Sequence, residues 1–376
     1  MRRPSPRVIL ALILSVAGLF RFWNLGVPNK LVFDEVYYVD GAKDYLNSAV
    51  ELTNGAAEFV VHPPVGKWLI ALGIQLFGDS PVGWRFSAAL FGTLSILIIY
   101  LVALKLFNSP LLALISAGLM SIDGLHLVMS RTALLDIFLM FFLLAAFLAL
   151  LYERHVVAAL LLGLALGTKW SAVYFIAALG IYLAFTYRKK LLIYIPIIPI
   201  TYLLTWSGWL ISNKGWSRDS SSNPLIALYN YHREILNFHT GLTTDHSYEA
   251  SPWNWLVLGR PTSFFYESPK TCGTDNCSQE ILAMGTPIIW WFGLIAIFIT
   301  LGYFIYRRER TAGLILLALL SNYLPWLFFP ERTTFYFYAI AFLPFLILTI
   351  AYSIKLYLED KALRPNGCKI SMLHLA

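Results

Sequence analysis

Charged residues are scarce in this sequence: Asp, Glu, Lys and Arg make up 13% of its 376 residues, whereas 58% are hydrophobic. A soluble domain carries roughly twice that charged fraction, at about 25%. Apolar runs of membrane-spanning length also recur from one end of the chain to the other. The composition therefore excludes a water-soluble protein and predicts an all-α polytopic membrane protein.

Cysteine is scarce as well, with three residues in total. Cys272 and Cys277 lie in one polar segment, and Cys368 lies near the C-terminus. No second pair of ligands accompanies them, which argues against zinc, and we expect neither a metal ion nor another cofactor. The turn-forming residues between Cys272 and Cys277 favour a disulfide bridge, with two free thiols as the alternative.

The sequence shows neither a tandem repeat nor a linker between folding units, so residues 1–376 are interpreted as one helical membrane domain. The first apolar run is followed by Arg21-Phe22-Trp23-Asn24 rather than by a cleavage site of small residues, so it is expected to remain as a span. The net charge of +7 fits basic clusters beside anionic lipids and does not indicate nucleic acid.

Hydropathy predicts a multi-span helical bundle with about 10 to 11 transmembrane helices. Two of the predicted spans, the third and the fifth, are short, which leaves room for a different count. The ten spans lie near residues 7–27, 82–105, 109–122, 134–151, 156–168, 170–187, 191–211, 285–305, 311–329 and 334–356.

Clusters of Lys and Arg orient these spans. Under strict alternation, the clusters within 2–7, 188–190, 307–310 and 355–369 all fall on one face. The positive-inside rule makes that face cytoplasmic. We therefore expect both termini inside the cell, and the loops 28–81 and 212–284 outside it. Within the first loop, apolar residues at helical spacing predict surface helices over 36–46 and 67–77.

Two adjacent carboxylates, Asp34 and Glu35, lie where the chain leaves the first span and enters a predicted surface helix. Asp34 fits the role of an N-cap, and Glu35 fits a first-turn carboxylate favoured by the helix dipole. The same pair, placed at a membrane surface, fits an active site. The two residues alone favour neither interpretation.

Further ionisable residues are expected at the same outer face. A charged side chain at the end of an apolar helix is costly unless it is paired or has a role in binding or catalysis. The alternatives are that each side chain extends to the membrane surface, or that Arg131 and Asp136 neutralise each other. Together the residues predict a cationic pocket beside carboxylates. Arg binds phosphate oxygens bidentately and Lys adds a compact charge, so the pocket suits a lipid-linked sugar phosphate. These residues are Arg85, Asp123, His126, Arg131, Asp136 and Lys169.

Six blocks of the sequence resemble the protein O-mannosyltransferases, membrane enzymes that take mannose from a polyprenyl phosphate. The resemblance implies a GT-C fold with an extracytoplasmic active site. Eukaryotic members carry a β-trefoil insertion that loop 212–284 is too short to hold, so a prokaryotic-type enzyme of a bacterial plasma membrane is expected. The six blocks are residues 33–36 (an Asp-Glu motif), 61–67 (His-Pro-Pro-x-x-Lys), 130–136, 167–171, 260–267 and 285–291.

The resemblance also implies roles for individual residues. It makes Asp34 the catalytic carboxylate near the acceptor hydroxyl, with Glu35 beside it holding the site or the peptide. It places Arg85 and Lys169 against the donor phosphate. It adds three motif positions as further substrate-binding residues, namely His62, Arg131 and Asp136.

The expected reaction is an inverting transfer of mannose from a polyprenyl-phosphate-mannose donor to Ser or Thr hydroxyls of exported proteins, with Asp34 as general base. One alternative is a related lipid-linked sugar transferase that acts on a lipid or glycan acceptor. Another is a transporter without chemistry. A transporter predicts charges near the middle of the membrane, whereas the charges here gather at one edge.

Overall fold

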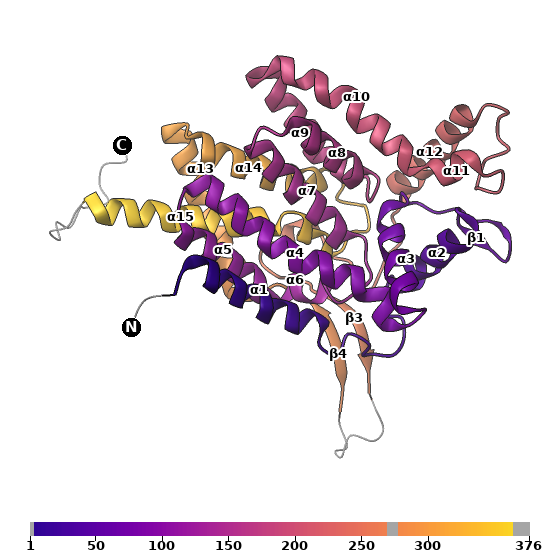
Figure 1. Ribbon diagram of the computed structural model, residues 1–376, viewed down its shortest axis with the longest axis horizontal. Helices are drawn as coiled ribbons and strands as arrows, with labels where there is room; N and C mark the ends of the chain where they lie inside the picture. Colours follow the sequence, from indigo (N-terminus) through magenta and orange to yellow (C-terminus); the bar gives the residue numbers. More distant parts are fainter. Residues whose placement is uncertain (1–3, 269–276, 364–376) are drawn as a thin grey trace.

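The computed structural model describes residues 4–268 and 277–363, and helices form most of it (Figure 1). The helices are α1 (Pro6–Phe22), α2 (Glu35–Ser48), α3 (Val65–Phe77), α4 (Pro81–Phe107), α5 (Pro110–Ile122), α6 (Gly124–Met129), α7 (Asp136–Leu151), α8 (His155–Leu166), α9 (Ala172–Thr186), α10 (Arg188–Thr205), α11 (Ser207–Ile211), α12 (Pro224–Gly241), α13 (Pro287–Arg307), α14 (Arg310–Tyr323) and α15 (Leu343–Leu363). Three short 3-10 segments, η1 (Pro252–Asn254), η2 (Leu324–Phe328) and η3 (Tyr336–Ala341), complete the helical part.

A helix occupies each of the ten predicted spans, and α2 and α3 occupy the two predicted surface segments. By length and apolar composition, three helical stretches within the described residues suffice to cross a membrane: α4, α13 and residues 310–328. Other apolar helices, among them α5, α7 and α8, are shorter. The overall helical membrane fold is confirmed, whereas the count of 10 to 11 transmembrane helices stays a prediction.

The helix boundaries follow local chemistry. Ser80 Oγ accepts a hydrogen bond from Gly83 N at 3.3 Å, and Ser109 Oγ accepts one from Leu112 N at 3.4 Å. Each serine precedes a proline, which fits the first turn of a helix because its missing N–H would have no partner there. These two caps start α4 and α5, and the cap at Ser109 lies in the very short connection between two predicted spans.

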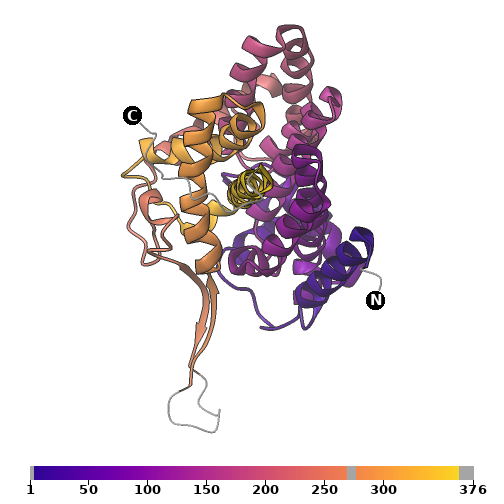
Figure 2. The ribbon, with the colours of Figure 1, turned by 90° about the vertical axis from the view of Figure 1, so that its left-hand side faces the viewer.

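Helix α15 lies in the middle of the bundle, where Figure 2 shows it end-on with other helices around it. The last predicted span began at residue 334, but residues 336–341 form η3 and the α-helix begins at Leu343. Pro344 explains this boundary, because proline is tolerated in the first turn of a helix and breaks the hydrogen-bond ladder further inside. The non-helical residues before α15 bring aromatic side chains to the site described below.

Different segments of the chain lie at the two ends of the molecule (Figure 1). The start of α1, the end of α15, the α13–α14 turn and the α9–α10 connection lie on one side, and basic residues occur at each of these places. Helices α2, α3, α11 and α12 lie at the opposite end. The loop residues that carry Asp34 and His62 therefore belong to the end away from the basic clusters.

Two antiparallel hairpins were not foreseen. β1 (Leu52–Thr53) pairs with β2 (Ala56–Ala57) around Asn54-Gly55, whose φ angles of 52° and 81° form the tight turn that this dipeptide favours. β3 (Thr262–Glu267) pairs with β4 (Gln279–Ala283), and this hairpin projects from the helical body (Figures 1 and 2). Cys277, just before β4, is disulfide-bonded. Its predicted partner, Cys272, lies outside the described residues, so that pairing stays a prediction.

Candidate active site

Asp34 occupies the position before the first residue of α2. Its backbone is helical, with φ −69° and ψ −3°, and its side chain forms no capping hydrogen bond with the described residues. The capping role that the sequence allowed is therefore not what the structure displays. Burial raises the pKa of the Asp34 carboxyl to about 6, because the charged form loses water; the nearby Lys169 lowers it and Asp136 raises it.

Phe33 fixes the chain immediately before Asp34. Its φ of 48° lies in the left-handed region, which is uncommon for a residue with a bulky side chain. The ring stacks on Phe264 of β3 at 4.7 Å, and meets Phe335 and Phe337 edge-on at 5.9 and 5.5 Å. These ring contacts hold the strained residue, so β3 and the segment before α15 together position Asp34.

Glu35 is fully buried and forms the centre of a hydrogen-bonded frame. Nε and Nη2 of Arg85 each donate to one of its carboxylate oxygens at 2.8 Å. The backbone N–H groups of Val32 and Ala133 donate to the same carboxylate at 3.0 and 2.9 Å. Glu35 thus ties α2 to α4 and to the turn that precedes α7.

Arg85 has no hydrogen left for a ligand in this arrangement. A guanidinium carries five N–H groups, and three of those on Arg85 donate to the carbonyls of Leu25, Pro28 and Lys30 at 3.2, 3.0 and 2.9 Å. The other two hold Glu35. The geometry therefore favours a positioning role for Arg85 over the phosphate contact expected from the sequence.

Arg131 also serves the frame. Its Nη1 donates to the carbonyls of Phe20, Arg21 and Trp23, and its Nη2 donates to that of Asn24. These are carbonyls at the C-terminal end of α1, where a cation is favoured. The suggested pairing of Arg131 with Asp136 is not what the structure has, since Asp136 pairs with another cation.

That other cation is Lys169. Its Nζ donates to both carboxylate oxygens of Asp136, at 2.8 and 3.0 Å, and both side chains are buried. The ammonium also lies 4.0 Å from the centre of the Tyr338 ring, within the range of a cation–π contact. Asp136 takes two of its three N–H donors, so Lys169 keeps one for a ligand.

Backbone contacts bring the motif of residues 61–67 to Lys169. Val65 N donates to Gly167 O at 3.0 Å, which joins the start of α3 to the turn between α8 and α9. The packing is close at Gly66, where a Cβ would lie 2.5 Å from Leu135 Cδ2. Motifs that are far apart in the sequence thus meet around one point.

A cavity of about 180 Å³ opens beside this point. Its polar wall contains Lys169 and side chains from the first outer loop, from α12 and from the segment before η3, and its apolar wall contains Val173, Tyr174, Leu236 and Phe329. The basic members of the lining are His62, Lys169, His239 and Arg332. A phosphate with a greasy tail fits such a cavity, because one wall supplies cations and the other apolar surface.

His62 presents a buried polar atom to this region. Its Nδ1 has no hydrogen-bond partner in the described part of the chain. The ring lies 5.5 Å from that of His239 and 6.0 Å from that of Tyr38, and burial lowers the pKa of His62 well below its usual value. A neutral imidazole with an orphaned nitrogen is suited to a hydrogen bond with a ligand hydroxyl or phosphate.

Arg332 is clamped to the end of α12. Its Nε donates to His239 O at 3.0 Å, its Nη2 lies 3.4 Å from His239 Nδ1, and its Nη1 donates to Thr333 O at 3.1 Å. The other ring nitrogen of His239 lies 3.0 Å from Val61 O. Nη1 and Nη2 therefore each keep one N–H for a ligand in the cavity that they line.

The structure divides the predicted site residues into two groups. Asp34, His62, Asp136 and Lys169 come together near the cavity. Glu35, Arg85 and Arg131 form the frame behind Asp34. No group of three or more His, Cys, Asp or Glu side chains is arranged to hold a metal ion in residues 4–268 and 277–363.

Sequence reasoning missed Arg332 and His239. A signal for Arg332 was available, because residues 330–333 separate the ninth and tenth predicted spans and therefore fall on the outer face. His239 also falls on the predicted outer face, but it lies within the long loop 212–284, and only the fold of α12 brings it to the cavity.

The helical fold is similar to that of solved structures of the GT-C type. The S. cerevisiae protein O-mannosyltransferase complex bound to the sugar donor superposes with a TM-score of 0.78 over 95% of this chain and 86% of that chain, at 14% identity. ArnT from Cupriavidus metallidurans in the apo state gives 0.64 over 93% and 60%, at 17% identity. At these identities the two likenesses establish the fold alone.

The sequence establishes the family. A model described as dolichyl-phosphate-mannose-protein mannosyltransferase matches residues 9–213, and one described as the C-terminal four-TMM region of protein-O-mannosyltransferase matches residues 225–375. The chain is 32% identical to the polyprenol-phosphate-mannose–protein mannosyltransferase of Corynebacterium glutamicum, over 91% of this chain and 80% of that protein. The chain therefore belongs to the protein O-mannosyltransferase family.

Proposed function

We propose that this enzyme transfers mannose from a polyprenyl-phosphate-mannose donor to Ser or Thr hydroxyls of exported proteins, with inversion at the anomeric carbon. The observation that carries the proposal is the position of Asp34, a half-buried residue whose carboxyl has a raised pKa, near a cavity lined by cations. The relative from Mycolicibacterium smegmatis, 31% identical over 95% of this chain, has a name that gives the same donor and a protein acceptor.

In the proposed mechanism, the donor phosphate lies against Lys169 and Arg332. Both residues keep N–H donors that are not used by the protein. Charge-assisted contacts of this kind stabilise the phosphate as it gains negative charge, so the leaving group needs little help from an acid. His62 Nδ1 supplies a further hydrogen bond to the sugar or the phosphate.

The chemical step is a single displacement. The acceptor oxygen forms a bond to the anomeric carbon while the bond from that carbon to the phosphate oxygen breaks, and its electron pair leaves with polyprenyl phosphate. Asp34 accepts the hydroxyl proton as general base. Attack from the face opposite the leaving group inverts the configuration, as in inverting glycosidases.

The pairing of Lys169 with Asp136 supports this division of labour. Asp136 neutralises part of the ammonium charge and fixes its position, so that Lys169 does not form an ion pair with Asp34. Asp34 is then free to accept a proton, since its carboxylate has no hydrogen-bond donor among the described residues. Two carboxylates in one site thus take different roles because of their surroundings.

We place the site on the extracytoplasmic face, with both termini in the cytoplasm. The support is that the basic clusters lie on the side of the molecule opposite α2, α3 and α12 (Figure 1). Positive residues mark the cytoplasmic side of membrane proteins. An exported polypeptide then meets Asp34 after translocation.

The test is a transfer assay with purified protein, polyprenyl-phosphate-[³H]mannose and a Ser/Thr-rich peptide. The proposal predicts labelled peptide, and an Ala-substituted peptide serves as the control acceptor. Label in a lipid or a glycan would support the related lipid-linked sugar transferases, such as the arabinosyl transferase of Pseudomonas fluorescens that is 28% identical over 67% of this chain. Absence of transfer from an intact donor would contradict the proposal.

A further inference from the structure

Asp136 anchors Lys169 on one side. Nζ of Lys169 donates to both oxygens of that carboxylate, at 2.8 and 3.0 Å, and to no other acceptor in the described part of the chain. Two hydrogen bonds to a single carboxylate fix the distance to Asp136, but they leave the ammonium free to swing about it. A second contact is therefore needed to hold the charge at one point of the donor cavity, as we name the space of about 180 Å³ lined by Lys169 and Arg332.

Tyr338 supplies the second contact. The centre of its ring lies 4.0 Å from Nζ of Lys169, closer than the ring of Phe337 at 5.8 Å, and Tyr338 also lines the donor cavity. The face of an aromatic ring attracts a cation, most strongly where water is excluded. Lys169 is only 6% exposed, so water weakens this attraction little. The ring thus holds the ammonium without offering an oxygen that would compete with a phosphate.

Other aromatic rings hold the Tyr338 ring in place. It meets Phe337 edge-on at 4.9 Å and Trp326 at 5.1 Å, and it contacts Phe335 and Trp255 at 6.0 and 6.2 Å. Its hydroxyl forms no hydrogen bond with any of the described residues. What Tyr338 contributes to Lys169 is therefore the face of its ring and not its hydroxyl.

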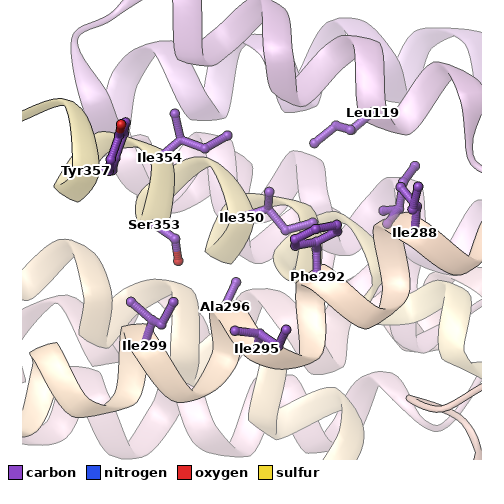
Figure 3. Close-up of a pocket in the computed structure, with 11 residues that line it drawn as sticks. Leu119, Ile288, Phe292, Ile295, Ala296, Ile299, Ile350, Ser353, Ile354 and Tyr357 are labelled. Atoms are coloured by element: carbon purple, nitrogen blue, oxygen red, sulfur yellow. The ribbon is translucent and has the colours of Figure 1, made fainter.

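An aromatic ring in a cavity wall does not by itself hold a cation. The apolar cavity of about 430 Å³ between α13 and α15 offers a contrast, because Phe292 and Tyr357 contribute rings to its wall (Figure 3). Its lining residues all belong to the described part of the chain, and neither lysine nor arginine is among them. The pairing of a ring with a cation is thus a feature of the donor cavity, where Tyr338 faces Lys169.

We propose that Tyr338 is a positioning residue for mannosyl transfer, because its ring fixes the Lys169 ammonium at a point close to both the donor phosphate and Asp34. The inference rests on the proposed function, since that function makes Lys169 a ligand of the donor and Asp34 the base. In this role Tyr338 acts through Lys169. Loss of the ring face should therefore change the donor affinity and the pH dependence of transfer, and it should change neither once the charge of Lys169 is gone.

The expected change in pH dependence has a definite sign. Burial raises the pKa of the Asp34 carboxyl, and the positive charge of Lys169 lowers it. An ammonium held by Asp136 alone spends time farther from Asp34, so the pKa of Asp34 rises and the rate begins to fall at a higher pH. The other titratable groups that face Asp34 or Lys169 stay unchanged in the experiment, and they are Asp136, Tyr38, His62 and His239.

The first variants remove the ring or keep it. Tyr338→Leu removes the ring face and should raise the donor KM by about 5- to 30-fold, as expected for a cation–π contact shielded from water. Tyr338→Phe keeps the ring face and should restore the donor KM. Tyr323→Leu is the matched control for lost packing, because Tyr323 is half-buried like Tyr338 and contacts the same Trp255 ring, at 6.3 Å, but does not line the donor cavity. It should leave the pH dependence in place.

A second series does not alter packing. Phenylalanine with one, two or three fluorine atoms on its ring is placed at position 338, and each fluorine withdraws electron density from the ring face while the shape of the ring hardly changes. With each added fluorine we expect the donor KM to rise above that of Tyr338→Phe, and the fall in rate at low pH to move to higher pH. A ring that only packs predicts no dependence on fluorine. In a Lys169→Met background the series should have no effect.

Binding of decaprenyl phosphate to the same variants separates this inference from the proposed function. Lys169 meets a phosphate with or without mannose, so the affinity for decaprenyl phosphate should weaken with fluorine number even in a protein that transfers no mannose. Failure of the wild type to transfer mannose would contradict the proposed function and leave this binding test in force.

Three results overturn the inference. One is a donor KM and a pH dependence that do not change with fluorine number. Another is an effect confined to the mannosylated donor, which would mean that the ring packs against the sugar. The third is an equal effect of the fluorine series in the Lys169→Met background, which would mean that the ring acts without the ammonium.

Discussion

The Arg85–Glu35 pair gives the prediction that most sharply separates a structural ion pair from a phosphate ligand. Both side chains are buried, and all five N–H groups of Arg85 bind protein oxygens. Arg85→Met leaves a buried carboxylate without its partner, and breaking a buried pair in this way costs about 3–5 kcal/mol of stability. Glu35→Gln leaves a buried guanidinium and should cost a similar amount.

The double variant Arg85→Met/Glu35→Gln should recover a large part of this loss, because neither buried charge remains. Recovery should be incomplete, since the carbonyls of Leu25, Pro28 and Lys30 lose their donor. The assay is thermal unfolding of the purified protein in detergent, together with the donor KM of each variant that stays folded.

We expect the donor KM of Arg85→Met to stay within about twofold of wild type, because the loss of a positioning residue acts on folding first. A different result would refute this reasoning: wild-type stability together with a donor KM raised by tenfold or more. Arg85 would then bind the donor phosphate, and the five hydrogen bonds described here would not persist in the donor complex.

Three further predictions follow from the site. Arg332→Gln should raise the donor KM by about 10- to 100-fold, as expected for the loss of a charge-assisted contact of about 1.5–3 kcal/mol. The peptide KM should stay unchanged. A change confined to the peptide KM would assign Arg332 to the acceptor site. The transfer rate should fall as pH drops below about 6 and be flat above it, because only the deprotonated form of Asp34 accepts a proton. Lys169→Met should move this fall in rate to higher pH, since Lys169 lowers the pKa of Asp34. If Lys169→Met leaves the pH dependence unchanged, the titrating group is not Asp34. In cells, Tyr229→Cys on α12 should react with an impermeant thiol reagent and Lys189→Cys only after permeabilisation; the reverse pattern would invert the proposed topology.

Several features of the fold were predictable because they depend on local patterns. Apolar runs located the helices of the bundle, and helical spacing located α2 and α3 on either side of the segment that carries His62. The six sequence blocks located Asp34, Asp136 and Lys169. In each case the signal lies within about one helix length of the residue concerned, where periodicity and capping are informative.

The partners of the charged residues could not be predicted in the same way. Arg85 meets Glu35 across 50 positions of the chain, and Asp136 meets Lys169 across 33. Charge and spacing indicated that cations and carboxylates gather at one face, but packing decides which cation neutralises which carboxylate. The β3 strand was missed for a similar reason, since its pairing with β4 and its contact with Phe33 are tertiary.

The account depends most on Asp34 as the general base, and Asp34→Asn tests this directly. Asn keeps the shape of the side chain but cannot accept the proton. The measurement is transfer of [³H]mannose to a Ser/Thr-rich peptide by the purified variant, with donor binding measured in parallel. We predict normal donor binding and a rate reduced by about 10² to 10⁴, the usual contribution of a general base. A folded variant that transfers mannose within a few-fold of wild type would contradict the account.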